Sequence, residues 1–449
     1  MKRDRKTRER YKRLIKLSFA AVMLLGLCML YAVAWSGYYN KAILQMPFYR
    51  RGNWMMILIY GILLVFFMNT YGGFKIGYLK NGNLIYSQIM AVLFTNLVTY
   101  LQVAVIDRRL VNPAYLLPMT GLELIFIVVW TMIFQMVYRN MFPPRRMLFI
   151  EGDRKDYHLM DKINARDDKY QICEVVSYKK NLETIKKKME LYDAVVIGDM
   201  PSHERNLLLK YCYISGIRSY SVPKISDVLL RSSDELNLFD TPLLLSRNMG
   251  LSVDQEWMKR AEDIIVSLLM MILFSPIFVL AAVGIKCTDG GPIFYKQERL
   301  TKDGKIFMIY KFRTMIVDAE KKSGPVLASE HDPRILPVGR ILRATRLDEL
   351  PQILNILKGE MSVVGPRPER PDLAAEIEKD VPEFNYRLRV KAGLTGFAQV
   401  YGKYNTTFYD KLKLDLMYIR KYSLFLDLKL ILMTPKIMFL KESTEGVKE

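Results

Sequence analysis

The chain has few residues that could form a disulfide framework or a zinc site. Its 449 residues include 4 cysteines and 3 histidines. These are Cys28, Cys173, Cys212 and Cys287, and His158, His203 and His331. They are scattered, with no C-x-x-C pair and no zinc-ligand spacing, so we expect neither a disulfide-stapled fold nor a zinc knuckle. Unpaired cysteines are typical of a reducing compartment.

Acidic residues are in the minority. Asp and Glu number 46 against 66 Lys and Arg, which gives a formal net charge of +20, while 51% of the residues are hydrophobic. This combination excludes both a disordered polycation and an ordinary soluble enzyme. The sequence has no basic stripe interleaved with aromatic residues, so the positive charge favours contact with anionic membrane lipid over binding of nucleic acid.

Apolar blocks fill most of residues 1–140. Four of them, at about residues 15–35, 54–71, 88–106 and 113–138, are close to the ~20 residues that a helix needs to cross a bilayer. Nine Lys or Arg within sixteen residues precede the first block, so the positive-inside rule places this end in the cytoplasm. We expect the first block to be a signal anchor and the four helices to return the chain to the cytoplasm.

The next segment lacks the glycines of a nucleotide-binding turn. Short apolar runs at Arg146–Ile150, Tyr192–Ile197 and around Ile217–Val222 predict an open α/β sheet over roughly residues 145–240. After the first run stands Glu151-Gly152-Asp153, with one glycine where a phosphate-binding turn needs three. The pattern favours a degenerate regulatory or interaction domain over a dinucleotide site.

A fifth apolar stretch, Lys259–Cys287, is long enough to span a membrane but contains Ser275-Pro276 in its middle. Proline removes a backbone donor and kinks a helix. Lys and Arg flank the stretch on both sides, which suits a re-entrant helix whose two ends face the cytoplasm. Charge alone leaves a complete span equally open.

Residues 291–315 predict a β-hairpin around an Asp303-Gly304 turn. The second strand ends in KFRTM, which carries Lys311 and Arg313. Two cations and a hydroxyl at a strand end could hold a phosphate, although a solvated strand face explains them equally well.

The segment GRILRATRLDELPQILNILKGEM, residues 339–361, places Asp348 and Glu349 at the start of an apolar helix, with Pro351 in its first turn. The two acids could simply cap the helix and offset its dipole. Alternatively, one carboxylate attacks phosphorus while its neighbour holds a divalent ion. Three arginines precede the pair, as suits a diphosphate substrate: Arg340, Arg343 and Arg346.

Residues 361–370, MSVVGPRPER, hold an arginine between two prolines. Pro366 and Pro368 restrict the backbone on either side of Arg367, which makes this side chain a candidate bidentate phosphate ligand. A purely structural turn is an equal alternative. The later AGLTG, residues 392–396, is a glycine-bounded turn of low specificity.

Taken together, six ordered motifs over about residues 254–440 resemble the bacterial sugar transferases, the polyprenyl-phosphate glycosylphosphotransferases that begin exopolysaccharide, capsule and O-antigen assembly. The motifs are KRAEDIIVSLLMMILFSP, YKQERL, KFRTM, LDELPQ, LKGEMSVVGPRPE and KAGLTGFAQVYGKYN. The four spans and the α/β domain resemble the long subclass of that family. Ala392 stands where many members have proline, which puts the stiffness of that turn in question.

The resemblance implies an enzyme of the bacterial plasma (inner) membrane, with its Rossmann-like and catalytic domains on the cytoplasmic face. It would move a sugar-1-phosphate from a UDP-sugar to undecaprenyl phosphate, release UMP and use Mg²⁺. Membrane lipid is a further expected partner, a homodimer is plausible, and nucleic acid is not expected. The sugar is not specified by the sequence, although the resemblance favours UDP-glucose or UDP-galactose.

Residue by residue, the resemblance implies that Asp348 is the nucleophile of a covalent phosphosugar intermediate and that Glu349 is its acidic partner, the two being the metal-binding carboxylates. Arg343 matches an arginine beside this pair. The matching phosphate-binding positions are Lys311, Arg313, Pro366, Arg367 and Pro368, and the break of the re-entrant membrane helix matches Ser275 and Pro276.

The expected fold is therefore a membrane α-helical bundle (1–140), an α/β Rossmann-like domain (141–253) and a mixed α/β membrane-associated catalytic domain (254–449) with a re-entrant helix over 260–287. Other functions stay open. A membrane glycosyltransferase releasing UDP commonly displays an Asp-x-Asp motif, which this chain lacks. A dehydratase or epimerase would need the missing glycines and a Tyr-x-x-x-Lys pair. A non-catalytic scaffold or regulator would make Asp348, Glu349 and Arg367 dispensable.

Overall fold

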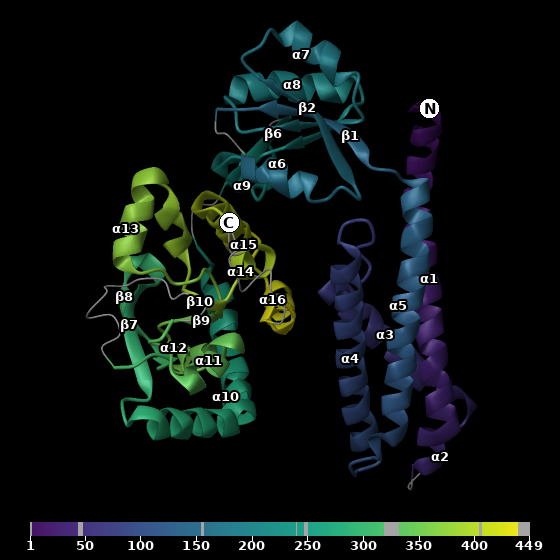
Figure 1. Ribbon diagram of the computed structural model, residues 1–449, viewed down its shortest axis with the longest axis vertical. Coiled ribbons are helices and arrows are strands. Elements are labelled where there is room, and N and C mark those ends of the chain that lie inside the picture. Colours follow the sequence, from purple (N-terminus) through teal and green to yellow (C-terminus); the bar gives the residue numbers. More distant parts are fainter. Residues whose placement is uncertain are drawn as a thin grey trace. The chain divides into compact units, whose positions relative to one another are not determined.

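The computed structural model describes residues 2–43, 48–153, 157–238, 240–246, 250–317, 332–403 and 406–438. The chain divides into two compact units, Met1–Lys224 and Ile225–Glu449. Figure 1 shows the long helices and the small sheet of the first unit, and the helix-rich second unit.

The first unit begins with four long apolar helices, as predicted. They are α1 (Lys2–Ala34, continued by a π-helical turn Trp35–Tyr39 and by α2, Asn40–Ala42), α3 (Arg50–Tyr71), α4 (Asn81–Ile106) and α5 (Leu116–Met141, preceded by a 3₁₀ turn Pro113–Tyr115). Each is long and apolar enough to cross a membrane. A buried polar cluster joins three of them, because Tyr60 Oη and Asn96 Nδ2 donate to the Glu123 carboxylate at 2.6 and 2.7 Å.

An α/β domain with a parallel sheet follows, also as predicted. Its elements are β1 (Arg145–Glu151), α6 (Tyr157–Asn164), β2 (Tyr170–Ser177), α7 (Leu182–Met189), β3 (Ala194–Ile197), α8 (Ser202–Ile214) and β4 (Arg218–Ser221). The strand order is β2-β1-β3-β4. Leu148 and Ile150 face the side covered by α7 and α8, while Met147 and Phe149 face α6, so apolar residues alternate between two covered faces (Figure 1).

The single glycine after β1 has a structural use. A Cβ on Gly152 would lie 1.9 Å from the carbonyl oxygen of Asp199, which follows β3. The next backbone N–H, that of Asp153, donates to this same carbonyl at 2.9 Å. Only glycine permits so close an approach between the two turns, and one of the N–H groups expected to face a phosphate is bonded to the protein.

The second unit opens with α9 (Ile225–Leu230) and a two-stranded antiparallel sheet of β5 (Asp234–Leu238) and β6 (Thr241–Leu245). The hairpin predicted around Asp303-Gly304 is confirmed: β7 (Phe294–Leu300) and β8 (Ile306–Phe312) pair antiparallel, and both turn residues have positive φ. The other elements are α11 (Pro337–Ala344), α12 (Gln352–Lys358), β9 (Ser362–Val364), α13 (Pro371–Asp380), β10 (Gly393–Thr395), α14 (Phe397–Tyr401), α15 (Phe408–Arg420) and α16 (Leu424–Met438).

Helix α10 (Val253–Asp289) contains the predicted re-entrant stretch. Its 37 residues form one uninterrupted helix, with Pro276 inside it, so Ser275-Pro276 does not break the helical backbone. Figure 1 shows α10 as two arms that meet at a sharp bend, and a proline within a helix is a common cause of such a bend. Many of its apolar side chains are exposed: Ile265, Leu268, Leu269, Ile272, Leu273, Val279, Leu280 and Val283.

One face of the first arm is packed against protein instead. Lys259, Asp263 and Ser267, spaced four residues apart, are buried. The Asp263 carboxylate accepts from Ser362 Oγ and from the backbone N–H of Val363 in β9, both at 2.8 Å. These contacts fix the start of α10 to the strand that leads into residues 365–368.

Candidate functional site

The adjacent acids lie in a sharp turn between two helices. Arg346, which ends the segment after α11, has a left-handed backbone (φ 54°), and a 3₁₀ turn over Leu347–Glu349 follows. Helix α12 begins only at Gln352, with Pro351 as its N-cap residue. The prediction that Asp348 and Glu349 start the helix and that Pro351 lies in its first turn was therefore a few residues early, because the 3₁₀ turn comes before the α-helix.

Glu349 sits between two cations. Its Oε1 atom accepts from Lys311 Nζ on β8 at 2.7 Å and from an Arg367 Nη at 2.9 Å. Burial opposes ionisation of Glu349, but the charges and hydrogen bonds of Arg367 and Lys311 outweigh it, so the pKa of Glu349 lies well below its usual range. Glu349 is therefore a fixed negative charge that holds both cations beside the turn.

Asp348 experiences the opposite balance. Burial and the neighbouring charge of Glu349 raise the pKa of Asp348, while Lys311, Arg343 and Arg367 act to lower it. Arg343 is exposed on α11, and because its charge acts on Asp348 it is part of the same site. The structure brings together four residues that the sequence proposed separately, Asp348 and the three cations, with the negative charge of Glu349 among them.

Close backbone packing orients the loop that carries Arg367. β9 and β10 pair in parallel, and a Cβ on Gly393 would lie 2.0 Å from the backbone nitrogen of Gly365. The Gly393 N–H donates to the Pro366 carbonyl at 2.9 Å. Pro366 and Pro368 are buried, while Arg367 is half-buried between them. The backbone of the AGLTG segment therefore packs directly against this loop, which explains its glycines.

Arg313 has partners other than those predicted. Its guanidinium pairs with both carboxylate oxygens of Asp289 at the end of α10, and its Nε donates to the Pro292 carbonyl at 2.7 Å. The residue is 5% exposed. In this structure Arg313 ties the end of α10 to the end of β8, whereas Lys311 two residues earlier reaches Glu349.

Sequence reasoning missed two residues that support the site. Asn355 of α12 is fully buried: its side chain accepts from the backbone N–H of Tyr310 at 3.0 Å and donates to the Met308 carbonyl at 2.8 Å. It thereby fixes α12 to β8 near Lys311. A polar residue inside the apolar run LPQILNILK could have indicated this role.

Arg387 is the second. It lies in the 3₁₀ segment Phe384–Arg389, is 4% exposed, and donates to the Arg367 carbonyl at 2.8 Å. It also pairs with buried Asp415 of α15 at 2.9 Å. Burial raises the pKa of Asp415 to about 6 although Arg387 acts to lower it. Arg387 has no sequence signal, because it stands in an ordinary charged segment.

A divalent cation would find two adjacent carboxylates here. Among the described residues there is no group of three or more His, Cys, Asp or Glu side chains that could hold a metal. Mg²⁺ is commonly bound through one or two carboxylates plus substrate phosphates and water. Asp348 and Glu349 fit that mode of binding, in which oxygens of the substrate complete the coordination.

Comparison with known proteins finds similarity in the second half of the chain. Residues 254–441 match the bacterial sugar transferase family. A UDP-glucose:undecaprenyl-phosphate glucose-1-phosphate transferase from Klebsiella pneumoniae is 36% identical over 57% of this chain and 54% of its own length. A UDP-N-acetylgalactosamine-undecaprenyl-phosphate N-acetylgalactosaminephosphotransferase from Aeromonas hydrophila is 34% identical over 54% and 58%, respectively.

A third relative is an undecaprenyl-phosphate galactose phosphotransferase from Salmonella typhimurium, 33% identical over 49% of each chain. The matches therefore span about half the length of these relatives. They agree on the kind of group transferred and differ in the sugar.

Proposed function

Because residues 254–441 match the bacterial sugar transferase family, we propose that this membrane protein transfers a sugar-1-phosphate from a UDP-sugar to undecaprenyl phosphate and releases UMP. The three relatives named above are sugar phosphotransferases that use undecaprenyl phosphate. The observation that carries the proposal is Asp348 beside Glu349, with Lys311 and Arg367 held on that second carboxylate. We place the reaction at the cytoplasmic face of the bacterial plasma membrane, as the first step of polysaccharide assembly.

The proposed reaction has two displacements at phosphorus. First, an Asp348 carboxylate oxygen attacks the phosphorus that bears the sugar; an O–P bond forms, the phosphoanhydride bond breaks, and UMP leaves with the bonding electrons. Second, a phosphate oxygen of undecaprenyl phosphate attacks the same phosphorus, the Asp348–phosphorus bond breaks, and the carboxylate is regenerated. The covalent stage lets a water-soluble donor and a lipid acceptor react in turn at one site.

The surrounding cations would stabilise the charge that develops in both steps. Lys311 and Arg367 are already held in place by Glu349, so they need no reorganisation when a diphosphate binds. Arg343 is exposed beside Asp348 and could reach the outer phosphate oxygens. Glu349, with Asp348 next to it, would hold Mg²⁺, and the ion would neutralise charge on the diphosphate.

We further propose that α10 is re-entrant, with both ends on the cytoplasmic side. Its exposed apolar side chains suit a lipid environment, and its two arms are joined by a bend (Figure 1). Lys259 and Arg260 near its start are engaged by protein: Arg260 donates to the carbonyls of Ile356 and Leu357 at the end of α12, each at 2.6 Å. This holds α10 against the end of α12, the helix that follows the candidate acids.

The test is to measure UMP and UDP separately. The purified full chain in nanodiscs receives Mg²⁺, undecaprenyl phosphate and a panel of UDP-sugars. We expect UMP with one donor and a loss of more than about a thousandfold in Asp348→Asn. Asp380→Asn, the same change at an exposed position at the end of α13, is the matched control and should keep full activity.

Three results would overturn the assignment. Release of UDP would mean that the sugar moves without its phosphate, as in a membrane glycosyltransferase. Full activity of Asp348→Asn would remove this residue as nucleophile. No nucleotide release with any donor would favour a scaffold role.

A further inference from the structure

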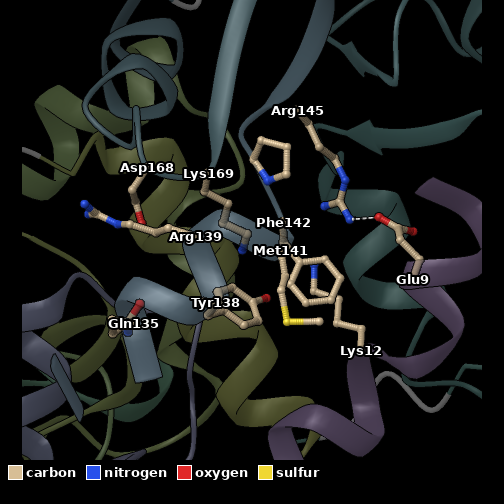
Figure 2. Close-up of a pocket in the computed structure, with 12 residues that line it drawn as sticks. Glu9, Lys12, Gln135, Tyr138, Arg139, Met141, Phe142, Arg145, Asp168 and Lys169 are labelled. Atoms are coloured by element: carbon tan, nitrogen blue, oxygen red, sulfur yellow. Dashed lines mark hydrogen bonds and ion pairs between the residues drawn. The ribbon is translucent and has the colours of Figure 1, made fainter. Parts of the chain in front are cut away.

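A pocket is lined by residues of the first unit, whereas the candidate site belongs to the second unit. It occupies the junction between the N-terminal part of α1, the end of α5 and the beginning of β1. Figure 2 shows side chains from α1, α5 and the α/β domain around it, among them Lys12, Tyr138, Arg145 and Lys169. Basic residues outnumber acidic ones in its lining: Lys12, Arg139, Arg145 and Lys169 against Glu9 and Asp168.

Both acidic residues of the lining are already paired with arginines. The Glu9 carboxylate forms an ion pair with Arg145 (Figure 2). It forms another with Arg218 at 2.7 Å. Asp168 accepts from Arg166 at 2.8 and 3.0 Å, in a two-point contact. Glu9 also attracts Lys12, and Asp168 also attracts Lys169, but each carboxylate is shared with an arginine.

The ammonium groups of the pocket lysines lie over aromatic rings. Lys12 Nζ lies 4.8 Å from the ring centroid of Phe142, and Lys169 Nζ lies 4.3 Å from that of Tyr78. Lys16, one turn after Lys12, lies 4.4 Å from the same Tyr78 ring. Burial lowers the pKa of Lys169, and Arg166 and Arg145 lower it further, while Tyr220 and Asp168 act in the opposite direction. An anion in the pocket would relieve this unbalanced positive charge.

The position of the pocket indicates where such an anion would come from. It lies where two apolar helices end, and tyrosine and tryptophan rings are typical of that depth. The turns of α1 and α5 beside it carry exposed apolar side chains, among them Leu14, Leu17, Met136 and Val137. Such a surface can accommodate acyl chains while the lysines contact a headgroup. Basic pockets between membrane helices are a recognised mode of binding for lipid phosphates.

We propose that this pocket binds the phosphate group of an anionic membrane phospholipid, held by Lys12 and Lys169 with Arg145 and Arg139 at its rim. The lipid would join the membrane helices to the α/β domain. The site lies outside residues 254–441 and is independent of the proposed transferase reaction.

The probes are phosphatidylglycerol, phosphatidylcholine and inorganic phosphate, added to the full chain in detergent. Thermal unfolding and native mass spectrometry report binding. The test variant is Lys12→Gln with Lys169→Gln, and the control is Lys187→Gln with Lys210→Gln, two exposed lysines of the α/β domain. Both pairs remove two positive charges. We expect phosphatidylglycerol to raise the Tm of wild type and control, and to bind the test variant about 25-fold more weakly, about fivefold for each lysine.

Three results would overturn the proposal. Equal affinity of the test and control variants would mean that net charge alone attracts the lipid. An equal effect of phosphatidylcholine would exclude recognition of an anionic headgroup. An equal effect of inorganic phosphate would identify a site for free anions. If the double variant does not fold, Lys169→Gln alone is expected to weaken binding about fivefold, and no change in that variant would likewise refute the site.

Discussion

Replacing Arg387 by methionine should destabilise the protein in a manner that depends strongly on pH. Arg387 is buried against Asp415, whose pKa of about 6 already lies above that of an unfolded Asp. Two charges about 4 Å apart at an effective dielectric constant of about 20 interact by ~4 kcal/mol. Loss of Arg387 should therefore raise the pKa of Asp415 far above 7.

In the folded variant, Asp415 can bind a proton and so avoid being a buried charge without its partner. With a pKa of about 6, the ionised form of Asp415 is favoured over the protonated form by ~1.4 kcal/mol at pH 7 and by about twice that at pH 8. The free energy of unfolding of Arg387→Met should fall by these amounts at pH 7 and 8, and by almost nothing at pH 5.5. The lost hydrogen bond to the Arg367 carbonyl adds ~1 kcal/mol at every pH. The total rises from about 1 to about 4 kcal/mol.

The sign follows from the raised pKa. An Asp whose folded pKa exceeds its unfolded value stabilises the fold at low pH, and that contribution is lost as the pH rises through the folded pKa. In Arg387→Met this loss continues to a higher pH than in wild type. The free energies of unfolding of the two proteins therefore diverge above pH 6.

Thermal unfolding of the full chain in detergent at pH 5.5, 7 and 8 measures this divergence. At roughly 3 °C per kcal/mol, the decrease in Tm should grow from about 3 °C to about 12 °C. Arg389→Met, at an exposed position two residues away, is the control and should show little change. Adding Asp415→Asn to Arg387→Met should remove the pH dependence. A decrease in Tm that is the same at all three pH values would refute the reasoning.

Three further predictions concern the candidate site. Glu349→Gln removes a charge that raises the pKa of Asp348, so the acid limb of the pH–rate profile for UMP release should move to lower pH. Gly393→Ala places a Cβ 2.0 Å from the Gly365 nitrogen and should destabilise the protein by about 1–3 kcal/mol or more in thermal unfolding. Chelation of divalent ions should abolish UMP release, and added Mg²⁺ should restore it.

Each has a contrary outcome. An acid limb that moves to higher pH in Glu349→Gln would mean that Asp348 is not the group titrating. Gly82→Ala, on a helix and facing open space, should be harmless, and equal damage from both glycine changes would contradict the packing argument. Activity that survives complete chelation would remove the metal from the proposed reaction.

Local patterns predicted the elements of this fold better than its contacts. The four apolar helices, the parallel sheet and the Asp303-Gly304 hairpin each follow from periodicity or turn chemistry within one segment. The cation pair on Glu349 does not, because Lys311 and Arg367 come from 38 and 18 residues away. Which strand-end cation reaches the acid depends on tertiary packing.

Arg313 illustrates the same limit. On sequence grounds it is as good a phosphate ligand as Lys311, two residues earlier. It is instead paired with Asp289, 24 residues away at the end of α10. Side chains at alternate positions of a strand share one face, so face alone could not separate them. The difference arises from where α10 ends, which the sequence pattern did not specify.

The ion pairs of Glu9 have a practical consequence for anyone who divides this chain. Glu9 belongs to α1, whereas its partners Arg145 and Arg218 belong to β1 and β4, 136 and 209 residues later. A soluble fragment of the α/β domain would keep both arginines and lose the carboxylate between them. An affinity tag placed on the N-terminal turn of α1 would crowd the same contact. Fragments and tags should therefore be judged by whether these ion pairs of Glu9 stay intact.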